Sequence, residues 1–191
     1  MATQDSTEHE TETSAERKTH VHGILSKMSN VMLLTYASPN PRPLVFARPL
    51  HVTKLEPSGA MWFIVALDSA KVREAQAVDV AYVNGHEGNR WVHLTGHVRV
   101  VTDRAKLREL WGKMQEVFFP HGADDPNVGL LYFEPEHAEY WDNSGMPGVR
   151  YLFEIARALV TGTAADADGI KGIHGEVGEA GVDANSLAHG S

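Results

Sequence analysis

The chain has 191 residues, of which 42% are hydrophobic, and its formal net charge is −8. It contains no cysteine, so disulfides, thiolate metal sites and cysteine nucleophiles are excluded, and a reducing, cytoplasmic location is expected. The acidic residues gather toward the two ends, which leaves residues 17–160 nearly neutral and without the basic stripe of a nucleic-acid-binding protein. No apolar run approaches the roughly 20 residues of a membrane-spanning helix. Neither nucleic acid nor membrane is therefore expected as a partner.

The sequence predicts three parts. Residues 1–16 are acidic and rich in Ser and Thr, which predicts a disordered leader, and they lack the basic and apolar regions of a signal peptide. Residues 17–160 have the length and apolar content of one domain. Residues 161–191 are rich in Gly, Ala and Asp, and a flexible tail is expected there.

The domain is predicted to be mainly β with peripheral helices. Helices are expected over residues 16–28, 70–77, 103–118 and 149–159. Strands are expected over residues 31–36, 44–55, 60–67, 78–84, 90–101, 128–133 and 137–141. Most connections are short, which favours antiparallel pairing, and the whole predicts a small barrel of about six strands.

One strand, residues 60–67, is apolar at every position. An antiparallel strand with one solvated face alternates between apolar and polar residues, as residues 90–101 do. Both faces of the 60–67 strand are therefore expected to be covered. In a domain of this size, the expected second cover is another subunit or a bound planar ligand.

The segment after this strand has the residues of a phosphate-binding turn. Ser69 suits the N-cap of the helix over residues 70–77, so Lys71 and Arg73 fall in the first turn of that helix. Cations in that turn oppose the helix dipole by a few tenths to about 1 kcal/mol each. Free main-chain N–H groups, a hydroxyl and two cations together suit a phosphate group. The alternative is that Lys71 and Arg73 simply point into water.

An arginine and the tryptophans are further candidates for ligand contacts. Arg48 precedes Pro49 inside a predicted strand, which indicates an edge or a bulge that aims the arginine at a ligand; an ordinary exposed arginine is the alternative. Flat apolar walls for a ring are available from the tryptophans, Trp62, Trp91, Trp111 and Trp141. For Trp111, which lies on the apolar stripe of residues 103–118, core packing is the alternative.

A metal site is not expected. His93 and His97 share one strand face but lie about 13 Å apart along it, which is farther than two ligands about 2 Å from one zinc ion can span. The sequence has no HExxH motif, no Walker loop and no GxSxG motif.

The order and spacing of several short segments are informative together. These segments are Leu33-Leu34-Thr35, Arg48-Pro49-Leu50, Trp62-Phe63, Asp68-Ser69-Ala70-Lys71-Val72, Trp91 to Gly96, Asp103 to Lys106 with Leu110-Trp111, Phe119-Pro120-His121-Gly122, Asp125-Pro126 and Ala138 to Asp142. In this order they resemble the general stress protein 26 family of the pyridoxamine 5′-phosphate oxidase-like, FMN-binding split-barrel superfamily, over about residues 17–160. The resemblance implies an antiparallel split barrel, a homodimer, and FMN bound at the interface between the subunits.

The resemblance also implies roles for individual residues. Ser69 and Lys71 match the phosphate-binding turn of the family. Arg48 and Leu50 match the strand that runs beside the isoalloxazine ring of the flavin. Leu50 stands where the family commonly has Met, which is one departure from its pattern.

Further residues match positions around the ring. Ile64 and Val65 match the strand segment whose main chain reaches the flavin, and Trp91 occupies the position of a polar side chain that contacts the ring. The aromatic residues expected to approach the flavin, in part from the partner subunit, are Trp111, Phe119 and Trp141. Phe118 departs from the family, which often has Trp there.

The sequence leaves several functions open. The leading hypothesis is an FMN-dependent oxidoreductase whose substrate the sequence does not identify, in which the flavin carries the electron chemistry. The alternatives are a non-catalytic flavin-binding stress protein, a deazaflavin- or haem-binding protein on the same barrel, and a dimeric interaction module. Oxidation of pyridoxamine 5′-phosphate is not expected, because the chain lacks the C-terminal Arg-x-His motif of the true oxidases.

Overall fold

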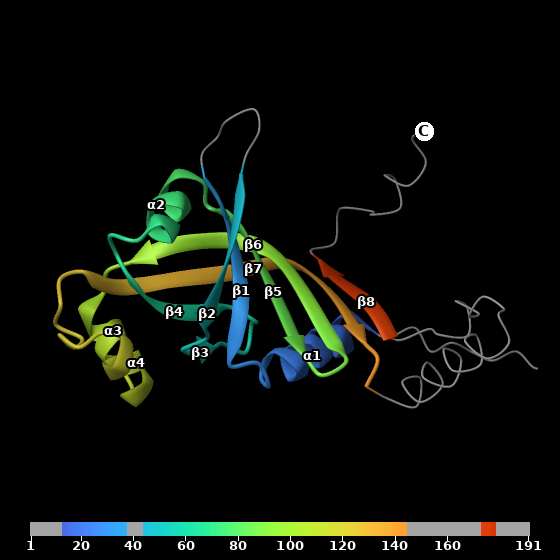
Figure 1. Cartoon of the computed structure of the whole chain (residues 1–191). Coiled ribbons are helices and arrows are strands. Elements are labelled where there is room, and N and C mark those ends of the chain that lie inside the picture. Colours follow the sequence, from blue (N-terminus) through green and yellow to red (C-terminus); the bar gives the residue numbers. More distant parts are fainter. Residues whose placement is uncertain (1–12, 38–43, 145–172, 179–191) are drawn as a thin grey trace, which may run out of the picture.

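A computed structural model describes residues 13–37, 44–144 and 173–178 (Figure 1). Its centre is a curled antiparallel sheet with strands in the order β2-β1-β5-β6-β7-β4-β3, and β8 pairs with the second half of β7. The strands are β1 (Asn30–Tyr36), β2 (Val45–His51), β3 (Lys54–Leu55), β4 (Met61–Ala66), β5 (Val80–Glu87), β6 (Arg90–Val101), β7 (Val128–Asp142) and β8 (Ile173–Gly178). The helices are α1 (Ser14–Leu25), α2 (Ala70–Ala77), α3 (Arg104–Leu110) and α4 (Lys113–Phe118). The predicted class, mainly β with peripheral helices and an antiparallel split barrel, is confirmed, although the curled sheet has eight described strands instead of six.

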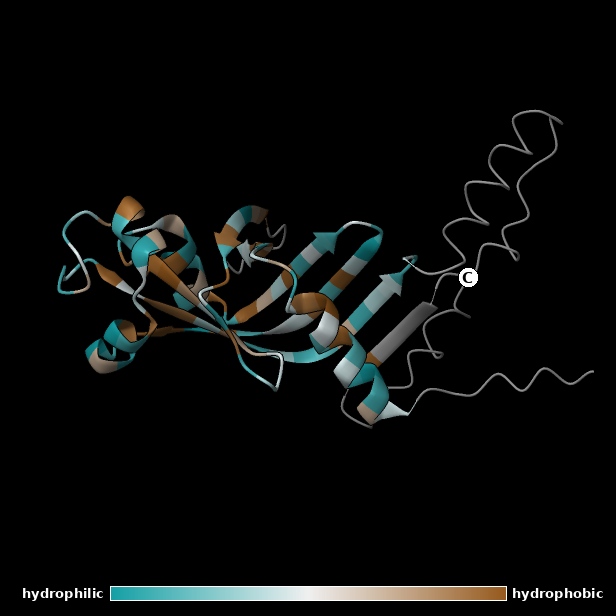
Figure 2. Cartoon of the chain, turned by 90° about the horizontal axis from the view of Figure 1, so that it is seen from below, coloured by the Kyte–Doolittle hydropathy of each residue, from teal (hydrophilic) through white to brown (hydrophobic). Residues whose placement is uncertain are grey.

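The inner face of the sheet buries the main core. Figure 2 shows hydrophobic and hydrophilic residues alternating along several strands. The buried hydrophobic residues of these strands pack together in one core cluster. Fully buried members of the core are Phe63, Val83, Leu94 and Phe133. α1 covers part of the core with Ile24 and Leu25, and α2 covers another part with Val72.

Several elements lie where the sequence predicts them. Helix α2 and strand β6 have the predicted bounds, residues 70–77 and 90–101. Asp103 caps α3, since its carboxylate accepts hydrogen bonds from the main-chain N–H groups of Ala105 and Lys106. Local signals, an alternating pattern and a helix cap, were sufficient to locate these elements.

The helix predicted over residues 103–118 is wrong as one continuous element. It is interrupted at Trp111 and Gly112, whose main chain is extended, and so divides into α3 and α4. The apolar stripe expected along it does not face a core throughout, because Val117 and Phe118 on α4 are 75% and 68% exposed. The pattern of apolar residues was real, but it does not belong to one helix.

Other boundaries differ from the predicted ones as well. The segment 44–55 forms two strands, β2 and β3, whereas the segments 128–133 and 137–141 belong to the single strand β7. α1 begins at Ser14, inside the predicted leader. β8 lies inside the segment 161–191, for which no regular structure was expected. The helix predicted over residues 149–159 lies outside the described residues.

A very close approach between β6 and β7 requires glycine at one position. The pairing register shifts between Thr95 and Gly96, where β7 is irregular opposite β6. A Cβ atom on Gly96 would lie 2.1 Å from the carbonyl oxygen of Glu134 and 2.8 Å from the Cα atom of Pro135. Main-chain atoms at such distances leave no room for a side chain, so Gly96 permits the irregularity.

We predict that Gly96→Ala lowers the free energy of unfolding by about 1–3 kcal/mol, as overpacking of a close contact does. Chemical denaturation monitored by circular dichroism measures this change. Gly23→Ala in α1 is the matched control, because a Cβ atom there meets nothing within 4 Å; alanine in a helix interior is expected to stabilise by roughly 0.5–1 kcal/mol. Equal stability of Gly96→Ala and the wild type would contradict the requirement for glycine at this close approach of β6 and β7.

Candidate functional site

The start of α2 is a helix N-terminus without a side-chain cap. Ser69 occupies the N-cap position, but its hydroxyl donates a hydrogen bond to the carbonyl oxygen of Ala66 (2.6 Å) and accepts none from the helix. The first turn of α2 contains no acidic residue. Ser69 therefore shapes the turn, and the positive end of the helix dipole is left for another anion.

Two cations lie in this first turn, and they have different surroundings. Arg73 is exposed, and its guanidinium donates to the carbonyl oxygen of Asp68. Lys71 is half-buried. Burial, followed by the positive charge of Arg48, lowers the pKa of Lys71 below its ordinary value of 10.5. The charges of Asp68 and Glu74 act in the opposite direction but do not outweigh these two effects. A lysine in such surroundings suits a site that binds an anion.

Arg48 on β2 is held by an ion pair that sequence reasoning did not find. Its guanidinium donates two hydrogen bonds to Glu74 of α2, at 2.7 Å to Oε2 and 2.9 Å to Oε1. Thr35 on β1, which is fully buried, donates its hydroxyl to Glu74 Oε2 (2.5 Å) and accepts from Arg48 Nη1 (3.1 Å). Arg48 is therefore a partly buried member of a network and not an ordinary exposed arginine. No local signal identifies Glu74 or Thr35, because the network joins segments 13 and 26 residues distant from Arg48.

The charge of Glu74 is secured by this network. Burial acts to raise the pKa of its carboxyl group, but hydrogen bonds from Arg48 and Thr35, together with the charges of Arg48 and Arg73, outweigh burial and lower the pKa below 4.5. The carboxylate is therefore ionised at neutral pH.

The split of the barrel, by which we mean the open edge of β4 that faces β2, lies beside these charges. Among the described strands, only β3 pairs with β4 on the side away from β7, at Met61 and Trp62. Main-chain groups alternate in direction along a strand. The carbonyl oxygen of Trp62 points to this edge, since it accepts from the N–H of Thr53, so the main-chain groups of Ile64 point to it as well. No described strand pairs with Ile64 there.

The split brings together some of the predicted site residues. Arg48 and Leu50 lie on β2, Ile64 lies on β4, and Ser69 and Lys71 follow directly after β4. The side chain of Leu50 is half-buried against the main core. Val65 is close in sequence, but its side chain is fully buried in that core and its main chain points toward β7.

The second face of β4 is covered by the chain itself. A second core cluster forms there from Ile64 and from residues of the α3–α4 segment, including Trp111 and Phe119. The rings of Trp111 and Phe119 lie 6.1 Å apart. The apolar pattern of residues 60–67 thus has a cause that sequence reasoning did not name, since it attributed the second cover to another subunit or a ligand.

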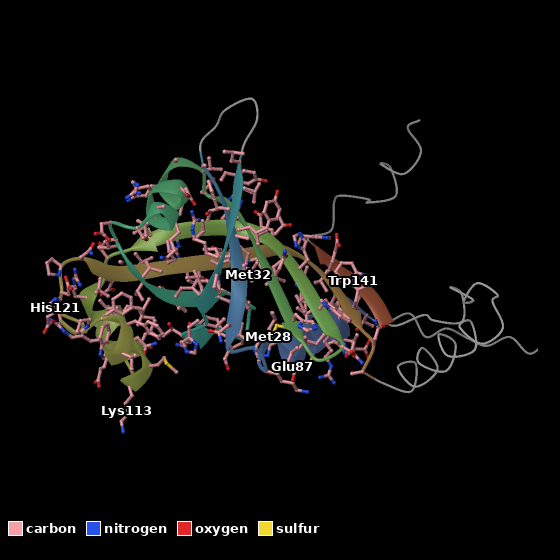
Figure 3. The ribbon with its side chains drawn as sticks, in the orientation of Figure 1. Met28, Met32, Glu87, Lys113, His121 and Trp141 are labelled. Atoms are coloured by element: carbon pink, nitrogen blue, oxygen red, sulfur yellow. The ribbon has the colours of Figure 1, made fainter. Side chains whose placement is uncertain are left out.

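Trp91 and Trp141 lie far from this cluster. They pair with each other across β6 and β7, and they are 40% and 38% exposed. Val101 and Ile64 both pair with Leu130, so Val101 marks the position of Ile64 along the sheet. Trp91 is ten residues from Val101 on β6, and ten residues of extended strand span about 33 Å. Figure 3 shows Trp141 near β8, at the opposite end of the molecule from Lys113 and His121. One ring system cannot contact Ile64 and both of these tryptophans within a single chain.

Trp91 and Trp141 belong to a largely uncovered surface, which we call the outer sheet face. Its hydroxyls and rings interact with one another: Tyr36 and Tyr82 share a hydrogen bond of 2.8 Å, and the ring of Tyr82 stacks on that of His93 at 5.6 Å. The residues of this face, by strand register, include Met32, Tyr36, Tyr82, His86, Trp91, His93 and Trp141. Exposed aromatic and apolar side chains gathered on one face are typical of an interaction surface.

A cavity of about 490 Å³ lies elsewhere, between α1, the β3–β4 turn and β7. None of the predicted site residues lines it. Two of its polar groups already pair with each other, because His97 Nε2 lies 3.1 Å from Glu136 Oε1. Its size alone therefore does not make it the functional site.

Two further properties concern metal binding and membrane-spanning helices. Within the described ranges, no three His, Asp or Glu side chains are grouped so that they could hold a metal ion. None of the described helices is long and apolar enough to cross a lipid bilayer.

Comparison with known proteins gives a family and several similar structures. The model of the family described as pyridoxamine 5′-phosphate oxidase like matches residues 16–166. Among proteins of curated function, none matches the chain. A candidate general stress protein 26 from Jannaschia sp. CCS1 is 26% identical with a TM-score of 0.61, and the match covers 86% of this chain and 99% of the other.

Two other solved structures share the fold. The general stress FMN/FAD binding protein from Xanthomonas citri is 23% identical with a TM-score of 0.56, covering 70% of this chain and 92% of the other. A pyridoxamine 5′-phosphate oxidase-related, FMN binding protein from Nostoc punctiforme PCC 73102 is 21% identical with a TM-score of 0.50, covering 70% and 84%. At these identities the likeness concerns the fold.

The lowered pKa of Glu74 generates a prediction for stability. The ion pair stabilises the fold fully above the ordinary pKa of 4.5 and is lost as the pH falls through the lowered value. The difference in free energy of unfolding between the wild type and Glu74→Gln is therefore expected to be constant from about pH 7 to about pH 5 and to shrink below that. Urea denaturation over this pH range measures it. A difference that rises as the pH falls would contradict the ion pair.

Proposed function

Because the chain belongs to the pyridoxamine 5′-phosphate oxidase-like family, we propose that it is an FMN-binding flavoprotein that acts as a flavin-dependent oxidoreductase. The observation that carries the proposal is the half-buried Lys71 beside Arg48 at the uncapped start of α2. The names of two similar structures, which mention FMN or FMN/FAD binding, support the flavin.

The start of α2 fits the phosphate group of FMN. A dianion there would interact favourably with the helix dipole, with Lys71 and with Arg48. It would also offset the burial and repulsion that lower the pKa of Lys71. Ser69 contributes by holding the turn through its bond to Ala66, so that the first main-chain N–H groups of α2 remain accessible.

The split fits the ring end of the flavin. Outward-pointing main-chain groups of Ile64 supply a donor and an acceptor for the polar edge of an isoalloxazine ring. Leu50 on β2 offers an apolar contact close by. When bound, the flavin supplies the electron-transfer chemistry, and the chain binds it, orients it and excludes water from it. Val65, Trp111 and Phe119 would support these contacts from the two core clusters.

The proposal includes a homodimer with FMN at the interface. The outer sheet face exposes aromatic residues that a second copy would cover. Trp91 and Trp141 lie too far from Ile64 to contact the same flavin within one chain. We propose that in this dimer the two tryptophans reach the flavin bound to the other copy instead.

We predict that Lys71→Glu weakens FMN binding by about 1.5–3 kcal/mol, the value of a lost charged hydrogen bond. This corresponds to roughly a 10- to 150-fold rise in the dissociation constant. Quenching of flavin fluorescence on titration with protein measures it. Lys27→Glu, at an exposed position after α1, is the charge-matched control and is expected to bind FMN as the wild type does. An unchanged dissociation constant for Lys71→Glu would place the phosphate elsewhere.

Catalysis is tested separately from binding. If the protein is an oxidoreductase, we expect NADH or NADPH to reduce the holoprotein anaerobically. We then expect added electron acceptors to reoxidise it. Protein that binds FMN tightly but shows neither step would instead be a flavin-binding protein without catalysis.

We predict that Trp91→Glu converts the dimer to a monomer at micromolar concentration. A carboxylate buried in an apolar interface without a partner costs several kcal/mol. We expect this cost to be large enough to dissociate the dimer. Analytical ultracentrifugation measures the change, and Lys27→Glu serves again as the control for added negative charge. A Trp91→Glu protein that stays dimeric would show that the outer sheet face is not the interface.

A further inference from the structure

Glu74 lies at the centre of the most connected side-chain cluster near the proposed phosphate site. Both of its carboxylate oxygens accept from Arg48, and one also accepts from Thr35. The cluster joins three elements, because Thr35 lies on β1, Arg48 on β2 and Glu74 on α2. An acidic residue beside a proposed phosphate site requires an explanation.

Arg48 needs an anchor because its strand offers little support. β2 is at the end of the sheet order, and its neighbouring residues Phe46 and Ala47 are exposed. One contact comes from Phe46, whose ring centre lies 5.0 Å from the Arg48 Cζ atom. An arginine side chain has many rotamers, and without a planar partner most of them would carry its charge away from the start of α2.

Glu74 is placed to supply that anchor. Its carboxylate matches the guanidinium in the bidentate arrangement that fixes both position and plane. Glu74 follows Lys71 by three residues on α2, so the two side chains lie on neighbouring parts of one helix face. The side chain of Glu74 is only 11% exposed, which limits alternative orientations.

We propose that Glu74 is a positioning residue: from the second turn of α2 it holds the Arg48 guanidinium beside Lys71, so that Arg48 and Lys71 form one preorganised site for the phosphate of the flavin. This inference rests on the proposed function. Burial and, after it, the charge of Arg48 lower the pKa of Lys71, so the two cations repel each other. An anchoring carboxylate keeps them adjacent before an anion arrives. Thr35, by donating to Glu74, orients the carboxylate in turn.

The experiment compares FMN with riboflavin, which lacks the phosphate. The ratio of their dissociation constants, measured by fluorescence quenching on the refolded full-length apoprotein, reports the phosphate contribution alone. We expect Glu74→Ala to reduce this preference for FMN at least fivefold, while riboflavin affinity changes less than twofold. Glu74→Gln, which keeps the shape and one acceptor, is expected to retain part of the preference, and it also serves if Glu74→Ala does not fold. Glu116→Ala, at an exposed position on α4, is the control.

A double-mutant cycle shows whether Glu74 acts through Arg48. In the Arg48→Ala background, Glu74→Ala is expected to cause no further loss of preference. The proposal is overturned if Glu74→Ala keeps the wild-type preference, if it weakens FMN and riboflavin equally, or if it costs as much without Arg48 as with it. A wild-type protein that does not distinguish FMN from riboflavin would overturn the phosphate site itself, and with it this inference.

Discussion

The repulsion between two adjacent cations is the constraint on which this account depends. Arg48 and Lys71 come from different elements, and burial followed by the charge of Arg48 lowers the pKa of Lys71. A fold does not keep two positive charges together, one of them half-buried, without a compensating anion. Glu74 compensates Arg48 within the chain. The charges of Asp68 and Glu74 offset only part of the effects that lower the pKa of Lys71, and in the proposed function the phosphate group of a ligand balances the rest.

The rest of the site follows from how the sheet curls. In the strand order of the sheet, β2 is at one end and β4 is next to the other end, yet the two strands contact each other. The barrel therefore almost closes and is left open between β2 and β4. α2 begins directly after β4, which brings its N-terminus to that same opening. Main-chain groups of Ile64 and the charges of Arg48 and Lys71 therefore meet at one place. The tryptophans of the outer sheet face lie elsewhere, and in the proposed dimer a second copy brings them to the flavin.

Local patterns predicted the parts of the fold that depend on local interactions. The bounds of α2 and β6 were predictable because a serine at the N-cap position marks α2 and strict alternation marks β6. The break at Gly112 was not, because glycine is tolerated within helices and the extended main chain of Trp111 depends on its packing in the second core cluster. The cover on the second face of β4 was also missed, because α3 and α4 return to it from some forty residues later in the chain.

In the candidate site, too, some residues could be predicted from the sequence and others could not. Ser69, Lys71 and Arg48 could be chosen from residue type and position, and the structure brings them together. Glu74 and Thr35 could not, because a single Glu in a helix and a single Thr in a strand resemble many others. The separation of Trp91 and Trp141 from Ile64 is a property of sheet register, which a single sequence does not contain.

A crystal structure of the protein with FMN would test the central claim most directly. The account predicts the phosphate within hydrogen-bonding distance, about 2.7–3.2 Å, of the Lys71 ammonium and of main-chain N–H groups at the start of α2, with Arg48 still paired to Glu74. A phosphate bound at another place, with Lys71 pointing into solvent, would contradict it.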